Sequence, residues 1–342
     1  RSVRKRLTEL LAEDGDPSLR EDDALRSAAF VPQAAVTMLV PAEIGDYTDF
    51  YSSRDHATNV GSMFRGAAQA LMPNWLHLPV GYHGRSSSIV VSGTSVRRPL
   101  GQTKDPADAR PRCGATRELD FELEVGAIVG RGNALGEAIP AASALDHVFG
   151  LVLVNDWSAR DIQRWEYVPL GPFLAKNFAT TVSPWVVGLE ALEPFRVAGP
   201  AQDDPRPLPY LRGADRAWYD VTLEVWLQSA AMRAEEAGSG VSICRTSFRH
   251  MYWSLAQQIA HHTVGGCNLR TGDLLASGTI SGPTAGERGS LLELAWRGSQ
   301  PIRLPTGEQR SFLEDGDRLT IRGWCQGDGY RIGLGECSGE VL

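Results

Sequence analysis

The stretch Leu119-Asp120-Phe121-Glu122-Leu123-Glu124-Val125 alternates strictly between apolar and acidic side chains. Successive side chains of a β-strand point to opposite faces, so this pattern predicts a strand with Asp120, Glu122 and Glu124 on one face. Residues two apart on a face lie about 7 Å from each other, which lets their carboxylates converge. Buried anions side by side resist ionising unless a cation lies among them. The stretch therefore favours a hard-cation site, and a solvated acidic face of an edge strand is the alternative for the strand taken alone.

The composition excludes several classes of protein. Of the 342 residues, 42% are hydrophobic and 22% are charged, as in ordinary globular proteins. A net charge of -7 without a basic run argues against nucleic acid as the main partner. No apolar stretch approaches the ~20 residues that a membrane helix needs. The five cysteines are widely spaced and form no C-x-x-C pair, which favours reduced thiols in a cytoplasmic protein.

The pattern of the chain changes near residue 36. Residues 1–35 are predicted to form a helical connector, and residues 36–342 a single large domain of short strands separated by glycine- and proline-rich turns. One long helix is expected near His250 to His262. Many strands with few helices indicate a β-rich α+β fold. The runs that predict strands are 89–91, 124–129, 148–154, 184–187, 219–227, 291–296 and 318–321.

Two further acidic residues extend the candidate cation site. Asp156 ends the apolar run 148–155, where it can face a pocket, and Asp49 lies in a turn-like segment crowded with aromatic residues. A turn-initiating role is the alternative for each. Together with Glu122 and Glu124 they supply four carboxylates. An all-oxygen set suits Ca²⁺ or Mg²⁺ and does not suit zinc, which prefers nitrogen and sulfur ligands.

Residues near these carboxylates are candidates for catalysis. His56 follows Asp49 by seven residues and could act as a general base on water, the alternative being a histidine that is hydrogen-bonded within a loop. Arg65 could hold a substrate carboxylate, or form a surface salt bridge.

Arg160, Gln163 and Tyr167 share one face if the segment after Asp156 is helical. Donors there could stabilise developing negative charge, and an amphipathic helix with one exposed side is the alternative. Lys176, between apolar residues, either lies at a site or extends its ammonium group to solvent.

Five longer runs resemble the fumarylacetoacetate hydrolase family. They are 45–51, 73–85, 120–124, 155–161 and 276–282. The resemblance covers the chain from the connector helices onward. It implies a catalytic domain that is a mixed β-sandwich roll, preceded by a small SH3-like barrel, so residues 1–35 are expected to follow such a domain. Ala175 and Ala179 depart from the family by standing where other members carry glycine.

The resemblance also implies roles for individual residues. The divalent cation, Ca²⁺ or Mg²⁺, would be held by Asp49, Glu122, Glu124 and Asp156, with Lys176 and Thr180 beside it. His56 would be the general base, and Glu293 the acid that orients it. The oxyanion-stabilising set would be Arg160, Gln163 and Lys176. The substrate contacts would be Tyr51, Arg65, Tyr82, Gln163, Tyr167 and Thr279.

The activity that the resemblance implies is hydrolysis of a carbon–carbon bond. The substrate would be 4-fumarylacetoacetate and the products fumarate and acetoacetate, as in the last step of tyrosine and phenylalanine degradation, carried out by a homodimer. Two alternatives remain open. One is a related metal-dependent activity, such as acylpyruvate hydrolysis or oxaloacetate decarboxylation. The other is a cation-binding protein without catalysis, against which the presence of both His56 and Glu293 argues.

Overall fold

The computed structural model describes residues 2–213, 216–235 and 240–342. The chain divides into two compact units, Arg1–Leu39 and Val40–Leu342. The first unit contains α1 (Ser2–Leu11), α2 (Asp23–Ala29) and the 3₁₀ turn η1 (Gln33–Ala35). The side chain of Asp22 begins α2 by accepting a hydrogen bond from the Leu25 amide at 2.8 Å.

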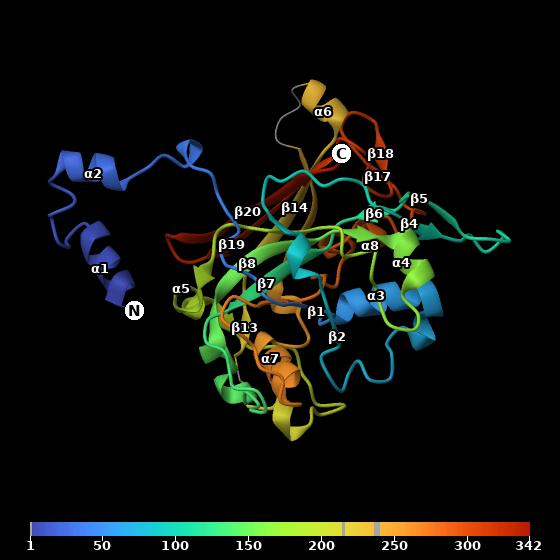
Figure 1. Ribbon diagram of the computed structural model, residues 1–342, viewed down its shortest axis with the longest axis horizontal. Coiled ribbons are helices and arrows are strands. Elements are labelled where there is room, and N and C mark those ends of the chain that lie inside the picture. The colour runs from blue at the N-terminus through green and yellow to red at the C-terminus, as the bar shows by residue number, and fades with distance from the viewer. Residues whose placement is uncertain (1, 214–215, 236–239) are drawn as a thin grey trace. The chain divides into compact units, whose positions relative to one another are not determined.

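The second unit is built on a mixed eight-stranded sheet. Seven strands follow one another in the order β2-β1-β16-β7-β8-β10-β3, and β11 pairs with β8 beside β10. Figure 1 labels β1, β2, β7 and β8 of this sheet. β1 pairs with β16, and β10 with β3, in parallel, whereas the other neighbours are antiparallel. The strands are β1 (Tyr47–Phe50), β2 (Gly81–His83), β3 (Ile89–Val91), β7 (Leu123–Val129), β8 (Val148–Asp156), β10 (Thr180–Val182), β11 (Val187–Gly188) and β16 (Leu274–Ala276).

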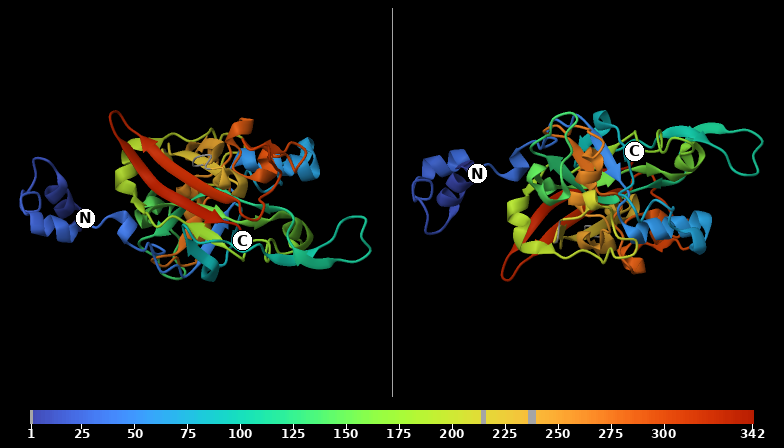
Figure 2. Two further views of the ribbon diagram at one scale, coloured as in Figure 1. Left: turned by 90° about the horizontal axis from the view of Figure 1, so that it is seen from above. Right: turned by 90° about the horizontal axis from the view of Figure 1, so that it is seen from below.

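A four-stranded antiparallel sheet packs against β8. Its order is β15-β14-β19-β20, with β14 at Thr222–Gln228, β15 at Val241–Ser247, β19 at Arg318–Gln326 and β20 at Arg331–Glu340. Figure 2 shows the long β19–β20 hairpin, in red, lying over the green strands β7 and β8. Alternate residues of β14 and β19 are buried, which indicates that one face of this sheet meets the core. The approach is close, since a Cβ atom at Gly323 would lie 2.8 Å from Cδ2 of Leu153.

Short elements complete the unit. The four small two-stranded sheets pair β4 (Leu100–Thr103) with β5 (Arg112–Ala115), β6 (Leu119–Asp120) with β9 (Ser158–Ala159), β12 (Arg196–Val197) with β13 (Trp218–Tyr219), and β17 (Ile302–Arg303) with β18 (Gln309–Arg310). The α-helices are α3 (Arg54–Arg65), α4 (Arg160–Glu166), α5 (Leu189–Leu192), α6 (Ala230–Ala234), α7 (Leu255–Thr263) and α8 (Leu291–Leu294). The 3₁₀ turns are η2 (Ala67–Gln69), η3 (Ser86–Ser88), η4 (Ala141–His147), η5 (Glu193–Phe195), η6 (Pro209–Leu211), η7 (Phe248–His250) and η8 (Ala285–Glu287).

The fold is β-rich α+β, as the sequence predicts, and several of its elements differ from the predicted ones. The strand expected over 119–125 is interrupted, because the Asp120 side chain accepts from the Phe121 amide at 2.8 Å and the Glu122 amide donates to the Asn155 side chain at 3.1 Å. Hydrogen bonds to side chains thus replace the backbone hydrogen bonds between strands at residues 121 and 122, and β6 and β7 belong to different sheets.

The prediction of a strand over 291–296 was wrong, because this segment contains α8. The side chain of Ser290 accepts from the Glu293 amide and so begins a helix. The expected helix at 250–262 begins later, at Leu255, where Ser254 and Gln257 form a capping box. The strand expected at 184–187 is reduced to β11, and β10 was not anticipated. Across the described ranges, no helix is both long and apolar enough to cross a bilayer.

Candidate active site

Four carboxylates from distant parts of the chain converge in the interior of the second unit. Asp49 lies on β1, Glu122 directly precedes β7, Glu124 is the second residue of β7, and Asp156 ends β8. One ligand oxygen from each lies within 4.8 Å of the others, and all four residues are buried. We call this set the carboxylate cage. Sheet pairing places its members, since Glu124 is opposite Val154 on β8 and Asp49 is opposite Ala276 on β16.

The carboxylate cage has the electrostatics of a cation site. Burial raises the pKa of Asp49 and of Glu124 well above the usual value, and the neighbouring carboxylates raise each further. Oδ1 of Asp49 and Oε1 of Glu124 are buried without a hydrogen-bond partner among the described residues. Buried acceptors of this kind are costly unless they are satisfied. The donor set is all oxygen, so these residues fit a hard divalent cation.

Two buried basic side chains flank one side of the carboxylate cage. Lys176 donates to Glu122 and, at 2.8 Å, to Oδ2 of Asp156. Arg160 donates from Nη1 to Oε1 of Glu122 at 2.7 Å, and from Nε to Oδ2 of Asp120 at 2.8 Å. Burial alone would raise the pKa of Glu122, but these two cations outweigh it and lower the pKa to about 2. Nη2 of Arg160 is buried without a partner among the described residues, so it can donate to a ligand.

His56 and Glu293 form a buried pair. Nδ1 of His56 lies 2.6 Å from Oε2 of Glu293. Three further side chains donate to the same carboxylate, Asn59 at 2.8 Å, Ser281 at 3.0 Å and Ser290 at 2.9 Å. Burial alone would raise the pKa of Glu293, but attraction to the His56 ring when it is protonated, together with these hydrogen bonds, outweighs burial and lowers the pKa. An ionised Glu293 holds the proton of His56 on Nδ1 and leaves Nε2 able to accept one.

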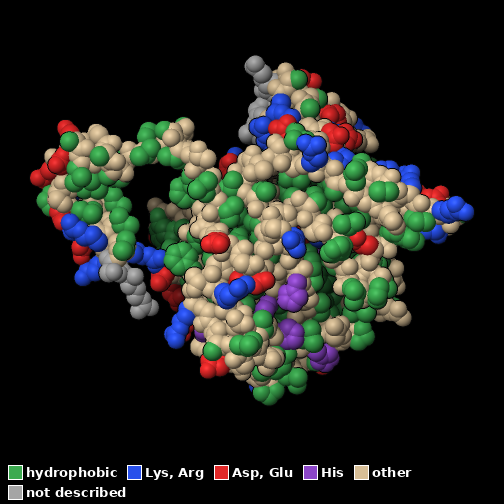
Figure 3. Space-filling view, in the orientation of Figure 1, with side chains coloured by type: hydrophobic (Ala, Val, Ile, Leu, Met, Phe, Trp, Pro, Cys, Tyr) green, Lys and Arg blue, Asp and Glu red, His purple; other side chains and the backbone are tan. Residues whose placement is uncertain are grey.

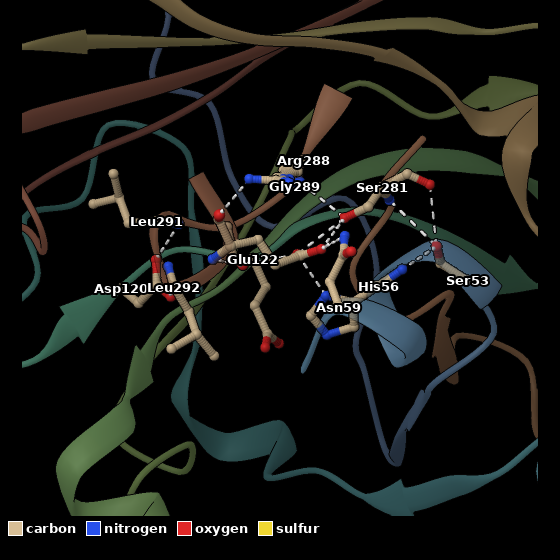
Figure 4. A network of polar contacts seen from close by, with 12 residues as sticks. Ser53, His56, Asn59, Asp120, Glu122, Ser281, Arg288, Gly289, Leu291 and Leu292 are labelled. Carbon is tan, nitrogen blue, oxygen red and sulfur yellow. Dashed lines mark hydrogen bonds and ion pairs between the residues drawn. The ribbon is translucent and has the colours of Figure 1, made fainter. Parts of the chain in front are cut away.

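Asp120 lies outside the carboxylate cage, although the alternation places it on the same face as Glu122. It accepts from the amides of Leu291 at 2.7 Å and Leu292 at 3.0 Å (Figure 4). It also accepts from Arg160. Asp120 therefore joins the Arg160 side chain to the helix that carries Glu293.

The other residues singled out in the sequence occupy different positions. Tyr82 and Thr180 each donate to Asp156, at 3.0 and 2.9 Å. The ring of Tyr51 packs edge-on against His56 with centroids 5.2 Å apart. Thr279 is buried in the segment after β16, and Gly278 beside it donates its amide to Glu124 at 3.1 Å.

Three candidates lie toward the protein surface. Gln163 accepts from Arg160 at 3.3 Å through Oε1. Tyr167 is half exposed. The Arg65 guanidinium donates to the carbonyl oxygens of Gln69 and Ala70 at the end of α3.

The family model described as "Fumarylacetoacetate (FAA) hydrolase C-terminal" matches residues 46–342. The chain belongs to the fumarylacetoacetate hydrolase family. This confirms the resemblance that the sequence motifs indicated. The fumarylacetoacetase of Homo sapiens is 60% identical over 324 residues, which are 95% of this chain and 76% of the relative. The fumarylacetoacetase of Caenorhabditis elegans is 57% identical over 99% of this chain and 80% of its own length, and that of Arabidopsis thaliana 51% identical over 100% and 79%.

Solved structures of lower identity share the fold of this fumarylacetoacetate hydrolase family member. A 5-carboxymethyl-2-hydroxymuconate delta-isomerase from Mycobacterium smegmatis aligns over 91% of this chain and 84% of its own, at 18% identity and a TM-score of 0.53. A fumarylpyruvate hydrolase from Pseudomonas aeruginosa, in complex with Mn²⁺ and pyruvate, aligns over 92% and 98%, at 18% identity and a TM-score of 0.50. These likenesses concern the fold alone.

The sequence reasoning missed the residues that surround Glu293. Asn59 lies three residues after His56 on α3, which is the spacing of neighbours on one helix face. Ser290 precedes Glu293 by three residues, the spacing of a helix cap. Both spacings were available in the sequence. By contrast, Ser281 comes from a separate loop and no local pattern marks it.

Proposed function

We propose that this chain is a hydrolase that cleaves 4-fumarylacetoacetate to fumarate and acetoacetate. Curated fumarylacetoacetases that are 49–60% identical over at least 95% of the chain support this function. The observation that carries it is the His56–Glu293 pair buried near a cage of four carboxylates. A purely structural ion would need the carboxylates but not the pair.

The carboxylate cage is proposed to hold Ca²⁺ or Mg²⁺, with Lys176 and Thr180 beside it. The unsatisfied oxygens of Asp49 and Glu124 support this assignment. A bound divalent cation supplies Lewis-acid polarisation of the two diketone oxygens.

His56 is proposed to act as the general base. With Nδ1–H bonded to Glu293, Nε2 takes a proton from water as the water oxygen attacks the carbonyl carbon next to the fumaryl group. The bond between that carbon and the acetoacetyl carbon then breaks, and its electron pair forms the acetoacetate enolate. The proton on Nε2 returns to the enolate carbon, which completes acetoacetate and restores neutral His56. The new carboxyl group, which keeps the second proton of the water, loses that proton to solvent and becomes fumarate.

Three donors are proposed to stabilise the negative charge that develops on oxygen. Arg160 has a free buried N–H, Lys176 carries a full charge, and Gln163 has its amide N–H₂ left because Oε1 is taken by Arg160. Such donors contribute most when they are fixed in place before the reaction. The substrate contacts are proposed to be Tyr51, Arg65, Tyr82, Gln163, Tyr167 and Thr279.

Other features of the protein are proposals that rest on the family. The catalytic domain, residues 36–342, is proposed to be a mixed β-sandwich roll. The protein is proposed to be a cytoplasmic homodimer that acts in the last step of tyrosine and phenylalanine degradation. On the face drawn in Figure 3, basic and acidic side chains are interspersed, so this face carries no continuous basic field of the kind that nucleic acid binds.

A substrate panel tests the proposed function. Purified protein with Mg²⁺ or Ca²⁺ is given fumarylacetoacetate, an acylpyruvate and oxaloacetate in turn, and the products are identified by NMR. We expect fumarate and acetoacetate to appear in equal amounts, with a kcat/KM for fumarylacetoacetate at least ~100-fold above that for the others. Preferred turnover of an acylpyruvate or oxaloacetate would replace this proposal with the related activity. Cation binding without turnover of any of the three would favour the non-catalytic alternative.

A further inference from the structure

Glu166, the last residue of α4, receives hydrogen bonds from three consecutive backbone amides. Oε1 accepts from Phe173 and Ala175, both at 2.8 Å, and Oε2 accepts from Leu174 at 3.1 Å. The described residues offer these amides no other acceptor. The carbonyl of Phe173 in turn accepts from the amides of Lys176 and Asn177, at 3.1 and 2.9 Å. We call residues 173–177 the Lys176 turn.

The carboxylate of Glu166 connects two parts of the proposed oxyanion-stabilising set. One part, Arg160 and Gln163, is on α4, and the other, Lys176, is on the Lys176 turn. Both parts reach Glu122, since Arg160 donates to Oε1 and Lys176 to Oε2. The distance between α4 and the Lys176 turn therefore determines whether both cations can reach the same carboxylate.

The loop between α4 and the Lys176 turn has little other support. Its apolar tip is open to solvent, with Leu170 96% exposed, and Phe173 at the start of the Lys176 turn is 67% exposed. Among the described residues, the backbone hydrogen bond within this loop runs from the Gly171 amide to the Tyr167 carbonyl. Few buried contacts and exposed backbone are the marks of a segment that opens easily. On the far side, Ala175 is held by two contacts, because its carbonyl accepts from Ala159 at 2.9 Å and its side chain is buried in a cluster with Ala159 and Ile162. This leaves the amides of Phe173 and Leu174, at the start of the Lys176 turn, to Glu166.

We propose that Glu166 is a positioning residue that fixes the Lys176 turn and so holds the Lys176 ammonium between Glu122 and Asp156. This inference rests on the proposed function. Glu166 is partly buried and lies at the end of its helix. Its effect on the reaction passes through the backbone of the Lys176 turn.

The test compares Glu166→Ala with Glu166→Gln and with a matched control, Glu118→Ala. Glu118 receives two hydrogen bonds from Arg164, also on α4, at 2.8 and 2.9 Å, and among the described residues it makes no hydrogen bond to the Lys176 turn. For Glu166→Ala we expect kcat to fall about 10- to 100-fold with KM within about 3-fold, since a small misplacement of a catalytic group has effects of this size. Glu166→Gln keeps one carbonyl acceptor, so its kcat should lie between those of Glu166→Ala and wild type. The kcat of Glu118→Ala should stay within about 2-fold of wild type, because a solvent-accessible ion pair such as Glu118–Arg164 contributes little.

A double mutant separates positioning from a general structural effect. If Glu166 acts through Lys176, then Glu166→Ala should lower kcat by less than about 2-fold in a Lys176→Met background. Equal losses in both backgrounds would overturn the inference, as would wild-type kcat in Glu166→Ala. Thermal midpoints of all variants check that each one folds.

Hydrogen exchange tests, independently of activity, whether Glu166 fixes the Lys176 turn. In wild type the amides of Phe173, Leu174 and Ala175 should be protected, and in Glu166→Ala they should exchange at least about 10-fold faster, because each loses its acceptor. Unchanged exchange would overturn the inference even if the chain had no activity. If the wild type were inactive but exchange were faster in Glu166→Ala, the proposed function would be contradicted. The role of Glu166 in fixing the Lys176 turn would still be established.

Discussion

Replacing Glu293 by Gln removes the negative charge behind His56 and keeps the shape of the side chain. The Glu293 carboxylate receives donors from four side chains, and it is fully buried. A Gln side chain can place its carbonyl toward Nδ1 of His56, because Asn59 can turn its amide and Ser281 can accept. The His56 tautomer is then retained, and the loss of charge is the main change.

The size of the effect follows from the distance between the two groups. His56 is neutral before the reaction and becomes positive as it takes the proton, so the charge of Glu293 acts mainly on the transition state. Two unit charges about 4 Å apart interact by about 4 kcal/mol at an effective dielectric constant of about 20. The carbonyl dipole of Gln retains part of this interaction energy. A net loss of about 3–4 kcal/mol corresponds to a fall in kcat of about 100- to 1,000-fold.

The assay is the loss of fumarylacetoacetate absorbance under saturating substrate. We expect kcat of Glu293→Gln to fall by the stated factor while KM changes little. Asn59→Ala serves as the comparison, because it removes one donor to Glu293 at about 1 kcal/mol and should lower kcat only about 5-fold. If Glu293→Gln kept more than a tenth of wild-type kcat, the reasoning about charge behind His56 would be refuted.

Four further predictions follow from the same contacts. Asp49→Asn should weaken Mg²⁺ or Ca²⁺ binding at least about 10-fold in calorimetry, because it removes a charged ligand of the carboxylate cage, and unchanged affinity would exclude Asp49 as a ligand. Lys176→Met should lower kcat about 100-fold in the absorbance assay, since it removes a donor fixed against Glu122, and a loss under 5-fold would count against that role. Asp120→Asn should lower the free energy of unfolding by about 3 kcal/mol in urea titrations, because Arg160 loses one of its two buried charge partners, and a loss below 1 kcal/mol would contradict this. The pKa of Glu293 is lowered in the folded chain, so its ionisation stabilises the fold above the unfolded pKa of about 4.3, and this contribution is lost as pH falls through the folded pKa. The difference in unfolding free energy between wild type and Glu293→Gln should therefore narrow below about pH 4.3. A difference independent of pH would disprove the linkage.

The parts of the fold that the sequence predicts are those with local signals. The apolar runs 124–129 and 148–154 correspond to β7 and β8, which are buried along most of their length. The alternation at Glu122 and Glu124 indicated the carboxylate cage because period two is a property of any strand. The cage is complete only through pairing of β1 with β16, and this register depends on contacts between distant segments.

The errors have identifiable physical causes. The segment 291–296 has apolar residues that fit either a strand or a short helix, and the cap at Ser290 decides for a helix. Asp120 fits the alternation, yet its side chain binds the amides of Leu291 and Leu292, far along the chain. Alternation assigns a face, and the partners found on that face depend on tertiary packing.

The central claim is that a divalent cation in the carboxylate cage is required for hydrolysis of fumarylacetoacetate. The most direct measurement is turnover by purified protein after chelation, and again after Mg²⁺ or Ca²⁺ is restored, with the metal content determined in each state. We predict that turnover is lost on chelation, returns with the cation, and does not return in Asp49→Asn at the same cation concentration. Full turnover by protein shown to be free of metal would contradict the account.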